Sequence, residues 1–208
     1  MTPCDTIIHE HICYLDRAAN DDERAHVLKT IDFTRRTPLA FERDHKAMGH
    51  IGATAVIVDM DAKKILLTQH TILKTWAFFG NHADGCLTLL NVARARIAKN
   101  VSHDFANKCR AYPAIFDVDV HYVPAHIRKG ENIPPHLHYD ISYLFSVSYE
   151  PITLGNNKWF SLDEATSFPN TDSQFRRILE KLVTNSSHAP LSPLPRQNTK
   201  NPLFIETP

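Results

Sequence analysis

The chain has 208 residues, of which 43% are hydrophobic and 22% charged, a composition typical of a soluble globular domain rather than a disordered or membrane protein. Lys plus Arg and Asp plus Glu each number 23, so no net charge attracts the protein to bulk nucleic acid or to an anionic membrane. The N-terminus lacks the basic and apolar regions of a signal peptide, and we expect a cytoplasmic protein.

The N-terminal part of the sequence has the spacing of helices. Apolar side chains recur at helical intervals over residues 6–37, interrupted by the charged run DDER. Pro38 ends this pattern because proline cannot continue a helix. We predict a helical extension over residues 1–46, a domain over 47–185 and a Pro-rich, flexible tail over 186–208.

The middle of the chain alternates between strand and helix patterns. HIGATAVIVD is typical of a buried strand, and KKILLTQH follows it after a short turn, which predicts a hairpin. WAFFG is a third short strand, and apolar spacing predicts a helix over residues 86–100. AIFDVDVHYVP and HLHYDISYLFSVSYE alternate as strands, and NNKWFSL precedes a final helix capped by Asp172. This order predicts an α/β fold with a mixed sheet between helices.

One motif makes the interpretation specific. WAFFGNHADG (residues 76–85) resembles the run WxxxGGHxDG that opens the Nudix box of many Nudix hydrolases. GHIGATAVIVD, PPHLHYDISYLF and NKWFSLDEA resemble flanking strands of that family in the same order, so the resemblance covers residues 47–182. It implies a Nudix-type α/β/α sandwich.

The box helix of that family carries glutamates that hold Mg²⁺, and this sequence departs from the pattern. With Asn81 at the box glycine, the glutamate positions fall on Leu87, Arg96, Lys99 and Asn100, and the stretch 85–101 contains no acid. Mg²⁺ requires oxygen ligands, and cationic side chains repel it. We therefore do not expect Mg²⁺ at this position, nor conventional pyrophosphohydrolase activity on nucleoside-diphosphate-X substrates.

The first functional interpretation is a binding module. Arg96 and Lys99, three residues apart on one helix face, would bind a phosphorylated or nucleotide-like small molecule directly. Asp119, His121 and Tyr139 are further candidates for ligand contacts in the family's cleft. The structural alternative is that the cations form a solvated helix face and the tyrosine belongs to the core.

The second interpretation places the chemistry on histidines. His82, His136 and His138 would hold Zn²⁺ or Fe²⁺ with an open position, because two histidines alternate onto one face of a strand. His82, Asp84 and Asp140 are then the candidate catalytic residues. The structural alternative is a set of hydrogen-bonded scaffold residues inherited from the family.

A third interpretation keeps hydrolysis but relocates the acids. The candidates for this role are Asp84, Asp119, Glu131 and Asp140. This requires a rebuilt metal site, because loss of the ligands removes both the Lewis acid and the activated water.

Overall fold

The computed structural model describes residues 3–43, 48–70, 75–128, 130–151, 155–169 and 171–185. Its helices are α1 (Pro3–Tyr14), η1 (Leu15–Arg17), α2 (Asp21–Arg36), α3 (Leu89–Asn100), α4 (His103–Lys108), α5 (Leu162–Thr166) and α6 (Ser173–Asn185). Its strands are β1 (Gly49–Asp59), β2 (Lys64–Gln69), β3 (Trp76–Ala77), β4 (Phe79–His82), β5 (Arg110–Val123), β6 (His126–Arg128), β7 (Glu131–Ile133), β8 (His136–Ser146) and β9 (Asn157–Ser161).

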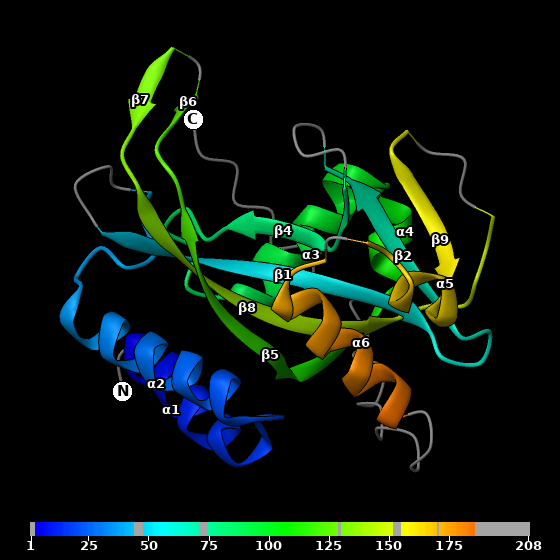
Figure 1. Ribbon diagram of the computed structural model, residues 1–208, viewed down its shortest axis with the longest axis horizontal. Helices are drawn as coiled ribbons and strands as arrows, with labels where there is room; N and C mark the ends of the chain where they lie inside the picture. Colours follow the sequence, from blue (N-terminus) through cyan, green and yellow to red (C-terminus); the bar gives the residue numbers. More distant parts are fainter. Residues whose placement is uncertain are drawn as a thin grey trace, which may run out of the picture.

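Strand β1 lies at the centre of a mixed sheet (Figure 1). One edge of β1 pairs in parallel with β8, from Gly49 opposite Leu137 to Val58 opposite Ser146. The other edge pairs antiparallel with β4 over residues 52–55 and with β2 over residues 57–59. β5 pairs antiparallel with β8, β9 with β2, and β6 and β7 form a separate ribbon beyond β5 and β8. The predicted mixed sheet is confirmed.

Helices cover both faces of this sheet. Alternate residues of β1 point to opposite faces, so they pack into two separate apolar clusters. Ile51 and Ile57 pack in the same apolar cluster as Ile97 of α3. Val56 and Val58 pack in a second cluster with Ile178 of α6. The described chain is therefore an α/β/α sandwich, as the sequence and its resemblance implied.

The N-terminal helices α1 and α2 lie along the outer edge of β5 (Figure 1). The backbone N–H of Val118 donates to Glu23 Oε1 at 3.2 Å, and that of Val120 donates to His26 Nδ1 at 3.3 Å. The Tyr14 hydroxyl lies 2.6 Å from the carbonyl oxygen of Phe116. These side chains occupy the backbone groups that an edge strand would otherwise offer to another chain.

A buried ion network joins α2, β5 and α6. Lys181 Nζ lies 2.5 Å from Glu23 Oε1 and 2.7 Å from Asp117 Oδ1. Arg177, 4% exposed, donates two 2.8 Å hydrogen bonds to Asp117 and one of 3.2 Å to Asp119. Burial acts to raise the pKa of Glu23, but the hydrogen bond and charge of Lys181 bring it below its usual value. Removing one cation would leave buried carboxylates without their partner.

Several local features differ from the sequence prediction. The helix expected from residue 86 begins at Leu89, because its N-cap residue Thr88 has non-helical backbone angles, φ −94° and ψ 83°. Helices α4 and α5 and the β6–β7 ribbon were not predicted. Ser102 and Ser161 accept N-cap hydrogen bonds at the starts of α4 and α5, a local signal for both.

The other large-scale predictions concern the N-terminal helices, the C-terminal tail and the domain boundaries. The helices expected over residues 6–37 are confirmed as α1 and α2. The predicted tail over 186–208 lies outside the described residues, and the domain boundaries remain predictions. None of the described helices combines the length and apolar character needed to span a membrane.

Candidate functional site

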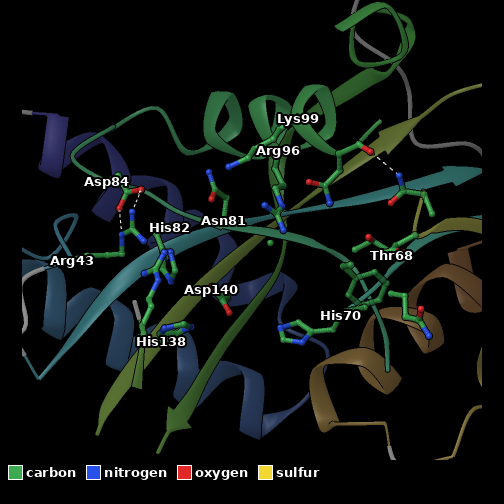
Figure 2. A pocket seen from close by; sticks show the side chains of 18 residues that line it. Arg43, Thr68, His70, Asn81, His82, Asp84, Arg96, Lys99, His138 and Asp140 are labelled. Carbon is green, nitrogen blue, oxygen red and sulfur yellow. Dashed lines mark hydrogen bonds and ion pairs between the residues drawn. The ribbon is translucent and has the colours of Figure 1, made fainter. Parts of the chain in front are cut away.

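A cavity of about 770 Å³ lies beside β4, with α3 on one side and β8 on the other (Figure 2). Its walls come from β2, β3, β4, α3, β6, β8, β9 and adjoining loops. The lining residues are Arg43, Thr68, Gln69, His70, Ala77, Phe78, Gly80, Asn81, His82, Asp84, Arg96, Lys99, Asn100, Arg128, His138, Asp140, Asn156 and Asn157.

The α3 wall carries three of the side chains that the resemblance aligns with the glutamates of the Nudix box. Arg96, Lys99 and Asn100 all line the cavity. Arg96 is half-buried, and its Nε is fully covered without a hydrogen-bond partner in the described part of the chain. Burial lowers the pKa of Arg96, because a guanidinium is poorly solvated there. The wall therefore presents cations, one of them with an unused buried N–H group.

Arg94, on the same helix, has a different role. Its Nη1 donates to the carbonyl oxygens of Ala106 at 2.5 Å and Cys109 at 2.9 Å. These bonds join α3 to the end of α4. Arg94 thus connects two helices, whereas Arg96 and Lys99 lie at the cavity.

The loop after β4 fixes Asp84 at the cavity rim. Asp84 and Gly85 both have positive φ, 47° and 81°. The positive φ of Gly85 favours glycine, whereas the nearest atom to an added Cβ, Glu42 Oε1 at 2.7 Å, ends an exposed side chain that can move. The Asp84 carboxylate accepts two hydrogen bonds from Arg43, the one from Nη2 at 2.7 Å. Its charge is therefore already compensated by an arginine.

Four histidines gather where β1, β4 and β8 meet. The ring of His50 lies 4.7 Å from that of His82, 5.1 Å from that of His136 and 4.6 Å from that of His138, between centroids. Burial lowers the pKa of His50 to about 3, of His82 to about 4 and of His138 to about 2, and neighbouring positive charge adds to each shift. These three imidazoles are accordingly neutral at pH 7.

Next to the histidines lies an acid with an unusual pKa. Burial raises the pKa of Asp140 to about 6, although the charge of His121, 3.7 Å away, acts to lower it. A hydrogen bond to Asp119 raises the pKa of His121. A carboxylate that titrates near neutrality at a cavity wall is suited to proton transfer.

The structure brings most of the sequence-predicted site residues together. His82, Asp84, Asp140, Arg96, Lys99 and His138 line the cavity. His136 contacts His138, with 3.2 Å between their Nε2 atoms, without lining the cavity.

Three of the predicted ligand contacts lie elsewhere. Asp119 does not line the cavity, and its carboxylate contacts His26 and Arg177, each at 3.2 Å. His121 lies beside Asp119 and Asp140 and does not line the cavity either. Tyr139 stacks on Phe33 of α2 at 4.1 Å between centroids, and it is a core residue here. Alternation sends this side chain to the face opposite His138 and Asp140.

Other residues of the site were missed by sequence reasoning. His50 sits in an otherwise apolar strand, and only the parallel register of β1 with β8 places it opposite His138. Arg43 and Arg128 come from a loop and from the unpredicted ribbon. The lone histidine in the run HIGATAVIVD was the available signal for His50.

No protein-family model matches this chain, and no curated protein matches it. Among solved structures, it resembles the E. coli dihydroneopterin triphosphate pyrophosphohydrolase, with 16% identity, a TM-score of 0.49, and coverage of 65% of this chain and 95% of that one. It also resembles the C. elegans Ap4A hydrolase, with 16% identity, a TM-score of 0.44, and coverage of 65% and 96%. A NUDIX family hydrolase from Clostridium perfringens has 15% identity, a TM-score of 0.43, and coverage of 65% and 97%.

The motif WAFFGNHADG lies on β3, β4 and the loop before α3. The α/β/α sandwich agrees with the fold that the resemblance in the sequence implied.

Proposed function

We propose that this chain is a divergent Nudix-type protein that binds a phosphorylated, nucleotide-like ligand without a magnesium ion held by α3. The observation that carries the proposal is the side chain of Arg96, which stands at a box glutamate position and lines the cavity with a buried, unpartnered Nε. A guanidinium can satisfy its donors with phosphate oxygens.

The donor set on α3 does not fit Mg²⁺. Mg²⁺ needs oxygen ligands in octahedral geometry, and the cavity face of α3 offers Arg96, Lys99 and the amide of Asn100. Two cations at these positions would repel a divalent ion by several kcal/mol at short range, taking an effective dielectric of about 20.

The rest of the cavity fits an anionic organic ligand. Arg128 adds a third cation to Arg96 and Lys99, while Asp84 is paired with Arg43. The volume of about 770 Å³ lies within the range typical of small-molecule sites, about 300–1,000 Å³. Phe78 and the amide of Asn81 give the wall apolar and hydrogen-bonding surface for a base or sugar.

The proposal is tested by calorimetric titration of the full chain with ADP-ribose and UDP-glucose. We expect a saturable affinity that is the same within about twofold in EDTA and in excess Mg²⁺, because the cations contact the phosphates directly. Adenosine, which lacks phosphate, serves as the control and should bind far more weakly. Binding that appears only with Mg²⁺ would contradict the proposal.

The same preparation separates binding from hydrolysis with relocated acids, for which Asp140 is the best-placed candidate. Each ligand is incubated with the protein and Mg²⁺, and products are followed by chromatography. We expect the ligands to remain intact. Mg²⁺-dependent cleavage at ordinary enzyme rates, lost in Asp140→Asn, would replace the binding role with that of a hydrolase.

A further inference from the structure

The histidine cluster contains one side chain whose environment is incomplete. His50 is 7% exposed, and its Nε2 has no hydrogen-bond partner among the residues that the structure describes. A buried polar atom without a partner costs on the order of 1–3 kcal/mol. His50 lies beside His82 and His138, so two other imidazole rings are its neighbours.

These three histidines have the spacing of a ligand set. One nitrogen from each of His50, His82 and His138 lies within 4.8 Å of the other two. A tetrahedral Zn²⁺ with bonds of about 2.1 Å separates its nitrogen ligands by about 3.4 Å. Modest side-chain rotation therefore brings the nitrogens to bonding distance. The three come from β4, β1 and β8, and β1 is hydrogen-bonded to both of the other strands, so one sheet holds all three side chains.

His136 completes the arrangement by orienting His138. Because its Nδ1 lies 2.8 Å from the carbonyl oxygen of Pro134, Nδ1–H donates there and Nε2 is left as an acceptor. The Nε2–H of His138, 3.2 Å away, donates to that acceptor. The lone pair of His138 then lies on Nδ1, free for a metal. A hydrogen bond that fixes the tautomer of a ligating histidine is a common feature of metal sites.

We propose that His50, His82 and His138 bind a Zn²⁺ ion, with His136 as a positioning residue and with an open coordination position on the cavity side. His82 and His138 belong to this group of donors and also line the cavity, so a small exogenous ligand can reach the ion from the cavity. Three imidazoles suit Zn²⁺ far better than Mg²⁺. This site is independent of the phosphate-binding role proposed for Arg96.

A second group of donors, His121, His138 and Asp140, also lies within 4.8 Å. The Nδ1 of His121 already lies 3.3 Å from Asp119 and 3.7 Å from Asp140, so two carboxylates compensate this ring without an ion. Within the described ranges, His50 Nε2 has no hydrogen-bond partner. The geometry therefore favours the group that contains His50, and the two groups predict different mutational results.

The test uses the full, tag-free chain, stripped with EDTA and titrated with Co²⁺ and then Zn²⁺. We expect one Co²⁺ per chain with the intense visible absorption of a four-coordinate site, displaced by one equivalent of Zn²⁺ as measured by elemental analysis. Because this experiment uses the unaltered protein, absence of stoichiometric metal overturns the proposal directly, whatever the ligand experiments show.

Variants assign the ligands. We expect His50→Ala and His82→Ala each to weaken Co²⁺ binding by more than about 100-fold, beyond the loss typical of an orienting residue. His103→Ala, an exposed histidine on α4, is the matched control and should leave binding unchanged. His136→Ala should weaken binding by about 10–100-fold while the four-coordinate spectrum is kept.

Circular dichroism of each variant shows whether it is folded, and His50→Gln, which keeps a polar side chain of similar size, replaces any variant that is not. Loss of metal in His121→Ala together with unchanged binding in His50→Ala or His50→Gln would transfer the site to the second group and overturn the assignment made here.

Discussion

Arg177→Met is expected to lower the free energy of unfolding by about 3–5 kcal/mol, because it leaves buried carboxylates without their main cation. Arg177 is 4% exposed and donates two hydrogen bonds to Asp117, itself fully buried, and one to Asp119. Methionine fills a similar volume but supplies no charge. Chemical denaturation followed by circular dichroism measures the loss.

Arg176→Met is the matched control. Arg176 is the preceding residue of α6 and is exposed, and its side chain donates to the carbonyl oxygen of Thr171. Its replacement should change stability by less than about 0.5 kcal/mol. Adding Asp117→Leu to Arg177→Met should recover part of the loss, since it removes the buried carboxylate that lost its arginine. A loss below about 1 kcal/mol in Arg177→Met would show that the network contributes little.

Arg96→Glu is expected to weaken binding of ADP-ribose by at least about 100-fold, or about 2.7 kcal/mol. The substitution removes a charge-assisted bond, which contributes about 1.5–3 kcal/mol, and places a negative charge beside the phosphates. Calorimetric titration in EDTA measures the change without any contribution from magnesium.

Ala95→Glu provides the control for charge alone. Ala95 is exposed on the same helix and does not line the cavity, so a carboxylate there should change the affinity by less than about threefold, given screening by salt. Equal losses in the two variants would mean that the net charge of α3, and not contact by Arg96, governs binding. Unchanged affinity in Arg96→Glu would remove α3 from the site.

The main elements of the fold followed from local patterns. The β-branched run of β1 and the alternation of β8 identify strands without tertiary information, and the spacing of α2 and α6 identifies helices. The motif at residues 76–85 then carries the resemblance that implies how these elements are arranged in a sandwich. Helix α4 and the β6–β7 ribbon were missed because six- and three-residue elements carry too few periodic positions.

The site was less predictable, because its residues meet through strand register. His138 and Asp140 could be placed on one face from alternation alone, and both line the cavity. His50 joins them only because β1 and β8 are parallel neighbours in one register, which no local pattern specifies. Tyr139 was expected at the ligand, but α2 provides Phe33 as its packing partner. That helix lies outside the part of the chain that resembles the family.

The network around Glu23 also has a consequence for biosynthesis. Glu23 meets its cationic partner Lys181 across 158 residues of sequence, and Tyr14 meets the same lysine across 167. At about 5–20 residues per second, a ribosome needs roughly 10–30 s to add that length of chain. During this interval α1 and α2 have left the ribosome without α6, and the carboxylate of Glu23 must stay hydrated. We therefore expect the N-terminal helices to dock on β5 only late in synthesis, when α6 has emerged.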